Sequence, residues 1–148
     1  TLKNDSRVLP FGSFLRKTKI NELPQILNII LGDLSIVGPR PQMQIDFEKY
    51  SNEVQQKIYN IRPGLTGIGS IVFRDEESLI SIAAENENPH HYYKRVIAPY
   101  KGELEMWYQK RRSMYLDFQL IFITALTIVF PKTTLYEKWF KDLPKRKF

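Results

Sequence analysis

Asn21 and Glu22 are the first adjacent side chains whose types and setting suggest chemistry, and two basic residues, Arg16 and Lys17, stand just upstream. Free backbone N–H groups at the start of a helix attract phosphate, and a carboxylate among bound phosphates usually holds a divalent metal ion or moves a proton. No acid–base role follows from an amide. The structural alternative is that Asn21 caps the helix and that the helix dipole favours Glu22.

Arg40 is a second candidate for phosphate binding because it lies between two prolines. Pro39 and Pro41 restrict the backbone on both sides, which lowers the entropy cost of presenting a guanidinium fork to phosphate oxygens. Arg62, which precedes a Pro-Gly pair, is a weaker case of the same kind. The structural alternative is an arginine in a rigid surface turn.

A helix that begins near Asn21 has to position these groups. Gly32 stands where a helix C-terminus takes a left-handed residue, and Pro24 fits only in the first turn, since deeper in the helix its ring would clash. The apolar stripe of this helix has the spacing of one helical face and is expected to contact either the core or a membrane. It consists of Leu23, Ile26, Leu27, Ile30 and Leu31.

The remaining pattern predicts one α+β domain over residues 1–148, mostly helical, with a small β element and amphipathic, membrane-associated helices. We expect a short strand at 35–37 and a glycine-spaced strand that continues from Pro-Gly to residue 73. Helices are expected over 43–60, 75–88, 92–115 and 115–130.

The composition limits the partners of the chain. Its net charge of +6 favours an anionic partner, such as a nucleic acid, an acidic membrane surface or a phosphorylated substrate. There are no cysteines, and His90 and His91 are adjacent, so a zinc site is not expected. The apolar run 115–130 is about one turn short of the roughly 20 residues of a spanning helix, which predicts a buried or interfacial helix.

Aromatic and basic side chains alternate near the end of the helix expected over 92–115. Such a segment suits stacking on nucleic-acid bases or a membrane interface, and the apolar run beside it favours the membrane. No nucleic-acid-binding motif is present. The acidic residues 75–77 and the histidine pair are expected to be solvated surface. The aromatic–basic segment contains Trp107, Tyr108, Lys110, Arg111 and Arg112.

Three ordered blocks, residues 11–41, 61–77 and 92–129, resemble the bacterial sugar transferases, the monotopic phosphoglycosyl transferases that begin glycan assembly on polyprenyl phosphate. The resemblance implies magnesium-dependent transfer of a sugar-1-phosphate from a UDP-sugar to undecaprenyl phosphate, with release of UMP. It also implies a place on the cytoplasmic face of a bacterial inner membrane, and it gives no role to nucleic acid.

In the family pattern an Asp-Glu pair follows a Leu-Arg-Lys-Thr segment, and the aspartate attacks the sugar-linked phosphate to form a covalent intermediate. By position, Asn21 takes the place of this nucleophile, and Glu22 takes that of its partner and is the candidate metal ligand. The phosphate-binding candidates are Arg16, Lys17, Arg40 and Arg62.

Asn21 departs from the family pattern, because an amide nitrogen is a poor nucleophile. Three explanations stay open: an engineered substitution, a natural branch in which Glu22 attacks or acts as base in direct transfer, and an inactive scaffold. We favour the natural branch, because asparagine caps a helix as well as aspartate does. The family's N-terminal re-entrant membrane helix is expected to be absent from this chain, and self-association through exposed apolar helices is a further expectation.

Overall fold

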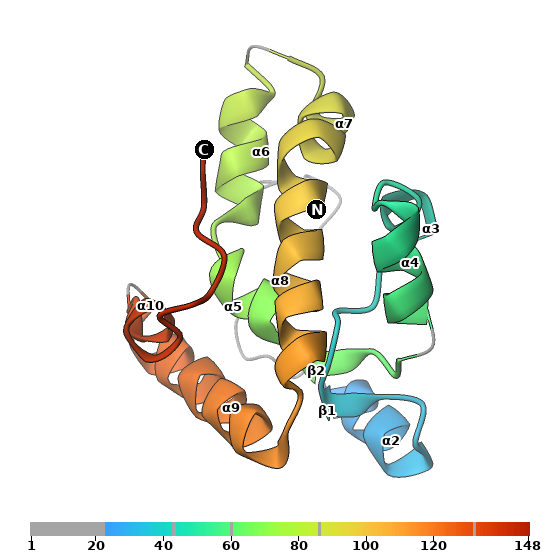
Figure 1. Cartoon of the computed structure of the whole chain (residues 1–148), viewed down its shortest axis with the longest axis vertical. Helices are drawn as coiled ribbons and strands as arrows, with labels where there is room; N and C mark the ends of the chain where they lie inside the picture. Colours follow the sequence, from blue (N-terminus) through green and yellow to red (C-terminus); the bar gives the residue numbers. More distant parts are fainter. Residues whose placement is uncertain (1–22, 43, 60, 86, 132) are drawn as a thin grey trace, which may run out of the picture.

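The computed structural model describes residues 23–42, 44–59, 61–85, 87–131 and 133–148 (Figure 1). Four site candidates, Arg16, Lys17, Asn21 and Glu22, lie outside the described residues. The described part is mostly helical with a two-stranded parallel sheet, as predicted. Its elements are α2 (Leu23–Leu31), β1 (Ser35–Val37), α3 (Gln44–Phe47), α4 (Asn52–Tyr59), β2 (Gly64–Thr66), α5 (Ile68–Val72), α6 (Glu76–Ala83), α7 (Pro89–Tyr92), the π-helical turn η2 (Tyr93–Ile97), α8 (Ala98–Arg111), α9 (Met114–Val129) and α10 (Leu135–Trp139).

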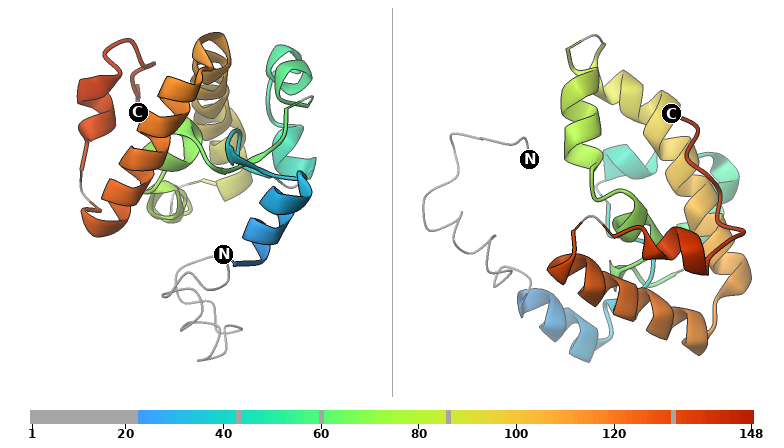
Figure 2. Two further views of the ribbon diagram at one scale, coloured as in Figure 1. Left: turned by 90° about the horizontal axis from the view of Figure 1, so that it is seen from below. Right: turned by 90° about the vertical axis from the view of Figure 1, so that its left-hand side faces the viewer.

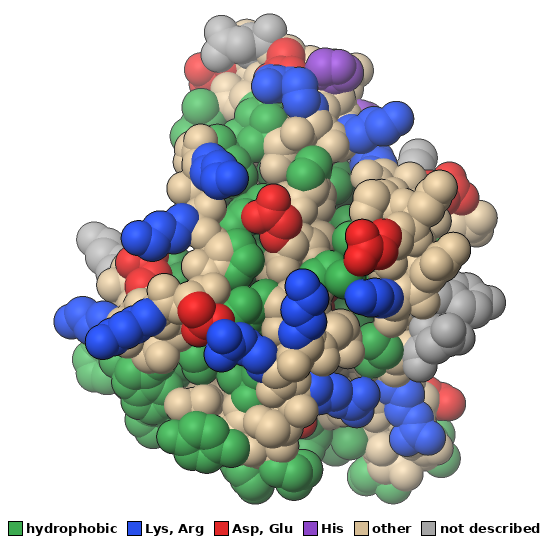
Figure 3. Space-filling view, in the orientation of Figure 1, with side chains coloured by type: hydrophobic (Ala, Val, Ile, Leu, Met, Phe, Trp, Pro, Cys, Tyr) green, Lys and Arg blue, Asp and Glu red, His purple; other side chains and the backbone are tan. Residues whose placement is uncertain are grey.

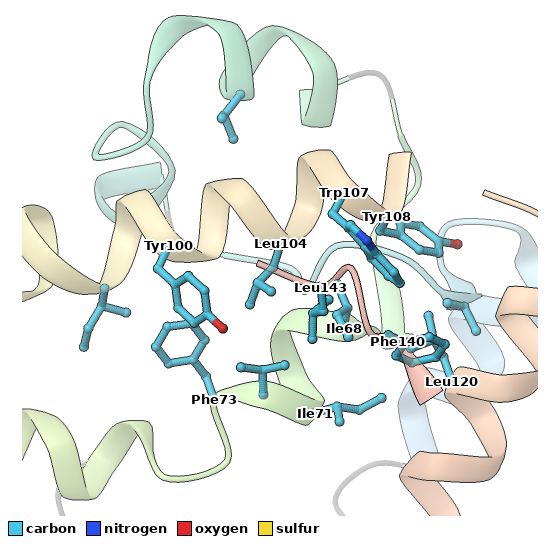
Figure 4. Close-up of a cluster of buried hydrophobic side chains, with 14 of the residues drawn as sticks. Ile68, Ile71, Phe73, Tyr100, Leu104, Trp107, Tyr108, Leu120, Phe140 and Leu143 are labelled. Atoms are coloured by element: carbon cyan, nitrogen blue, oxygen red, sulfur yellow. The ribbon is translucent and has the colours of Figure 1, made fainter. Parts of the chain in front are cut away.

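Helix α8 runs through the middle of the molecule and organises the core. Helices α3 and α4 lie on one side of it, and α5, α9 and the C-terminal segment lie on the other (Figures 1 and 2). Figure 4 shows side chains from α5, α8, α9 and the C-terminal segment converging on one cluster. Leu104 of α8 and Leu120 of α9 are fully buried within it. Each such side chain contributes about 1.5–3 kcal/mol when it is removed from water.

The glycine-spaced segment after Pro63 is a strand for only three residues, so the predicted strand up to residue 73 is wrong in its second half. Gly67 is extended, and α5 begins directly after it. Ile68, Ile71 and Val72 have the spacing i, i+3 and i+4 and are all buried, which suits one face of a helix. The helix expected over 43–60 is likewise two short helices, α3 and α4.

Helix α9 has a buried face and an exposed apolar face. Its cap is Ser113, whose hydroxyl accepts a hydrogen bond from the Leu116 N–H at 3.2 Å. Among the described helices none has the length and apolar character to span a bilayer. The buried face consists of Leu116, Leu120, Ile123 and Thr127, and the exposed large side chains are Met114, Tyr115, Phe118, Phe122, Ile128 and Val129.

The C-terminal segment runs beside α5 and α6 (Figure 1) and completes the core with Phe140 and Leu143. Near its end, Arg146 donates to both carboxylate oxygens of Asp75, at 2.6 and 2.9 Å. The prediction that the acidic residues 75–77 are solvated surface is therefore wrong in part, because Asp75 has an ion-pair partner. Glu76 also has a partner, because Lys101 donates to it.

Candidate active site

Helix α2 follows the candidate pair in the sequence, but Asn21 and Glu22 themselves lie outside the described residues. The described part of the helix runs from Leu23 to Leu31 and contains Pro24. Gly32 follows the helix with φ of +85°, and its N–H donates to the Ile29 carbonyl at 3.1 Å. The prediction of a left-handed glycine at this helix end is confirmed.

The apolar stripe of α2 lies mainly outside the core of the described structure. The exposed fractions of Ile26 and Leu27 are 46% and 61%, and those of Ile30 and Leu31 are 75% and 74%. From sequence, this stripe could equally have contacted the core or a membrane. The structure leaves it available to a partner outside the described chain.

Arg40 is held on a backbone segment that neighbouring residues fix. The Gly64 N–H donates to the Pro39 carbonyl and the Ser35 N–H donates to the Pro63 carbonyl, both at 2.8 Å. The Arg40 side chain is exposed and has no hydrogen-bond or ion-pair partner within the described residues. A guanidinium that is positioned by its backbone and not neutralised by a carboxylate is available to an anion.

Three glycines allow the backbone around Arg40 to pack this closely. A Cβ on Gly64 would overlap the Gly38 amide nitrogen and lie 2.7 Å from the Gly38 Cα, and a Cβ on Gly67 would overlap the Gly38 carbonyl. These positions therefore require residues without side chains. The packing brings the segments that carry Arg40 and Arg62 side by side.

Arg62 lines a pocket of about 450 Å³ near the C-terminal end of α2, where its Nη1 lies beside Gly32. Its phosphate-binding role stays a prediction. Sequence reasoning did not connect Arg62 with Arg112, because the two are distant in the chain and only the tertiary packing brings them to one pocket. The pocket is lined by Ile29, Leu34, Ser35, Ile36, Ile61, Arg62 and Arg112.

A buried polar network joins α8 to α6 and to the turn η2. Lys101 donates to both carboxylate oxygens of Glu76, at 2.7 and 2.8 Å, and to the Tyr93 hydroxyl at 3.3 Å. Burial raises the pKa of Tyr93, so its hydroxyl stays protonated. Gln42 donates to the Tyr50 hydroxyl at 2.6 Å, which ties the segment after Arg40 to the same part of the core.

Glu105 is the most buried carboxylate of the described residues, with 5% exposure, and its Oε2 has no hydrogen-bond partner. Burial raises the pKa of Glu105 to about 7, and the positive charge of Lys101 opposes this rise. The sequence analysis missed this residue. The available signal was its position on α8, one residue after Leu104 and three before Tyr108, on the face that packs into the core.

The aromatic–basic segment does not form a surface for stacking. Trp107 and Tyr108 are buried, at 8% and 2% exposure, so the predicted contact of these rings with bases or lipid is wrong. The Trp107 indole N–H donates to Asp142 at 2.6 Å, and the Arg111 guanidinium stacks on the Trp107 ring and pairs with the same carboxylate. His90 and His91 are exposed, as predicted.

No group of three or more metal-ligating side chains occurs in the part of the chain that the structure describes. The predicted metal ligand, Glu22, lies outside that part. The described residues therefore supply no ligand set for magnesium, and the magnesium requirement stays a prediction.

An exposed arginine without a polar partner among the described residues is a candidate for binding an anionic group. The model of the bacterial sugar transferase family matches residues 1–131, so the chain belongs to this family. The match agrees with the resemblance that the three sequence blocks carry.

Several relatives share this region. The chain is 36% identical over 135 residues to a UDP-glucose:undecaprenyl-phosphate glucose-1-phosphate transferase of Xanthomonas campestris pv. campestris, which covers 88% of the chain and 25% of that protein. It is 32% identical over 128 residues to an undecaprenyl-phosphate galactose phosphotransferase of Salmonella typhimurium, and this match covers 86% of the chain and 23% of that protein. It is also 32% identical over 128 residues to the uncharacterized sugar transferase EpsL of Bacillus subtilis, and this match covers 86% of the chain and 54% of that protein. The chain thus spans about a quarter of the length of the first two.

Proposed function

We propose that this chain transfers a sugar-1-phosphate from a UDP-sugar to undecaprenyl phosphate and releases UMP, as the first membrane step of polysaccharide synthesis. Family membership and the names of the relatives support the substrates. The structural observation that carries the proposal is Arg40, an exposed guanidinium between two prolines on a glycine-packed backbone, without a polar partner among the residues that the structure describes. This arrangement suits one phosphate of a diphosphate.

The transfer exchanges one bond to phosphorus for another. In direct transfer, an oxygen of the lipid phosphate bonds to the sugar-linked phosphorus, and the bond from that phosphorus to UMP breaks, with its electron pair leaving on UMP. Arg40 would stabilise the charge that develops on this leaving group. Since Asn21 is an amide, we assign to Glu22 the role of general base, which accepts a proton from the incoming lipid phosphate. We further propose a magnesium requirement, with Glu22 as the candidate ligand.

Release of UMP tests the transfer reaction. We expect the chain, incubated with a panel of UDP-sugars, magnesium and undecaprenyl phosphate, to release UMP only when the lipid phosphate is present. Glu22→Gln should lower the rate by about 100-fold or more, the usual loss when an acid–base group is removed. Asn21→Asp should leave the reaction measurable.

Two further variants distinguish a specific phosphate contact of Arg40 from the effect of removing any one positive charge from the surface. Arg40→Gln should lower the rate about tenfold or more, since a hydrogen bond to a charged group is worth about 1.5–3 kcal/mol. Arg95→Gln removes the same charge at a residue paired with Glu87 on another part of the surface and should have little effect. UMP release seen only with Asn21→Asp would favour the alternative, a scaffold that has lost catalysis. No release from either form would contradict the transferase proposal.

We also propose that the exposed apolar faces of α9 and α2 lie on the cytoplasmic face of the inner membrane. Figure 3 shows hydrophobic side chains along the lower edge of the molecule, where Figure 1 places α9 and α2, with basic side chains above them. Apolar side chains bordered by lysine and arginine suit an interface with anionic lipids. The burial of Trp107 and Tyr108 disfavours the rival proposal of a nucleic-acid binder.

Vesicle binding tests the membrane proposal. We expect Phe118→Glu on α9 to weaken binding to anionic vesicles about tenfold or more, because a phenylalanine side chain contributes about 1.5–3 kcal/mol on burial. Ile82→Glu on α6 is the matched control: the exposed fractions of the two side chains are 64% and 63%, and α6 lies away from α9. Equal losses in the two variants would contradict the assignment of this face. A shift from dimer to monomer with Phe118→Glu, without loss of vesicle binding, would assign the face to a second copy of the chain.

A further inference from the structure

Arg62 and Arg112 stand out among the arginines of the described residues because neither has a polar partner there. Arg40 shares this property and belongs to the proposed transfer site. Two unpaired guanidiniums that line one pocket suit an anion, because each presents several N–H donors at a fixed charge. The other described arginines bind a backbone carbonyl or a carboxylate: Arg74, Arg95, Arg111 and Arg146.

The pocket that contains Arg62 and Arg112 has no acidic side chain in its lining. Apart from Ser35, the other lining residues are aliphatic. Asp117 is a nearby carboxylate, but it accepts a hydrogen bond from the Tyr108 hydroxyl at 2.7 Å and forms no ion pair with Arg112. The two positive charges are therefore not neutralised within the described residues.

Both arginines extend from backbone that is already fixed. Arg62 precedes Pro63, whose carbonyl accepts the Ser35 N–H at 2.8 Å. Arg112 lies in the bend between α8 and α9, directly before Ser113, the residue that caps α9. Binding an anion therefore requires little ordering of the backbone, which lowers the entropy cost.

Exposed large apolar side chains occur close in the sequence to the residues that line the pocket. Ile30 and Leu31 at the end of α2 have exposed fractions of 75% and 74%, and Met114 and Tyr115 at the start of α9 have 72% and 74%. Ile36, which lines the pocket, is 49% exposed. A small soluble anion gains nothing from these side chains, whereas a molecule with a phosphate head and hydrocarbon chains contacts both the arginines and the apolar rim.

We propose that the pocket between Arg62 and Arg112 binds the phosphate group of an anionic lipid, whose hydrocarbon chains contact the exposed ends of α2 and α9. The nine residues of α2 span about 13 Å at 1.5 Å per residue, so this pocket at the C-terminal end of the helix is separate from the end of the described helix at Leu23. The inference rests on the proposed membrane association and does not depend on sugar-phosphate transfer.

Co-sedimentation with vesicles tests this lipid site. The chain would be mixed with phosphatidylcholine vesicles with and without phosphatidic acid, and the ratio of the two affinities measured. We expect the Arg62→Gln and Arg112→Gln double variant to lose about 100-fold of the preference for phosphatidic acid, about tenfold for each charged hydrogen-bonding group. Lys110→Gln, an exposed neighbour on α8 outside the pocket lining, should lose no more than about fivefold, as for one general surface charge.

Each other outcome of this experiment has a definite meaning. Equal losses in Lys110→Gln and in each single arginine variant would overturn the site in favour of diffuse charge. Strong binding of inorganic phosphate to the chain without vesicles, lost in the double variant, would overturn the lipid assignment in favour of a free-phosphate site. Arg112→Lys should keep part of the preference, because it retains the charge but not the fork. UMP release is not measured here, so failure of the lipid site and failure of the transferase proposal are distinguishable.

Discussion

Gly64→Ala is expected to lower the free energy of unfolding by about 3 kcal/mol, which corresponds to a fall in Tm of roughly 10 °C for a domain of this size. The new methyl group would meet backbone atoms of Gly38, which cannot move aside as a flexible side chain can. The two segments would have to separate and would strain the hydrogen bonds from Gly64 to Pro39 and from Gly38 to Thr66, at 2.8 and 2.9 Å. Thermal and urea unfolding measure the effect.

Gly102→Ala is the matched control for this substitution. Gly102 lies inside α8, and the nearest atoms to a Cβ there would belong to the side chains of Val54 and Tyr50, at 3.2 and 3.6 Å, and not to the backbone of another described segment. Alanine is favoured over glycine within a helix by about 1 kcal/mol, so this variant should be nearly neutral. If Gly64→Ala were as stable as Gly102→Ala, the close packing of the segments that carry Arg40 and Arg62 would be incorrect.

Glu105→Gln is expected to stabilise the protein at pH 8 and to reduce the pH dependence of its stability. Burial raises the pKa of Glu105 from 4.5 to about 7, with Lys101 opposing the rise. Between these pH values the folded protein binds more protons than the unfolded chain, so stability falls as pH rises through this range. The loss from this carboxyl amounts to about 3 kcal/mol, at 1.36 kcal/mol per pH unit. Urea unfolding at a series of pH values from 5 to about 8 measures it.

Glu103→Gln provides the control for Glu105→Gln. It removes the same charge two residues away on α8, but from an exposed side chain, and should leave the pH dependence unchanged. The opposite contribution of Asp75 does not interfere, because the Arg146 guanidinium lowers the pKa of Asp75, so its stabilising effect is lost only at lower pH. The prediction would be contradicted if the wild-type protein became more stable from pH 5 to pH 8 and Glu105→Gln showed the same pH dependence. Glu105 would then be ionised in the folded protein at little cost.

Some elements around the candidate site can be predicted from short sequence patterns, and others cannot. The three-residue strand at 35–37 and the left-handed Gly32 follow from propensities and backbone preferences that act within a few residues. The strand predicted over 68–72 is wrong, because the β-branched residues Ile68, Ile71 and Val72 favour a strand locally, whereas their burial at i, i+3 and i+4 stabilises a helix. Local spacing does not decide between these when the segment is only five residues long.

The sequence by itself determined the family, the mostly helical α+β class and Arg40 as a candidate anion-binding residue, because these depend on residue types in order along the chain. The tertiary structure decided which apolar faces are buried: the Trp107 side packs into the core, while the stripe of α2 and one face of α9 remain exposed. It also placed Glu105 in the core and brought Arg62 and Arg112 to one pocket. Burial and proximity of distant residues depend on how helices pack against each other, and no local pattern encodes that packing.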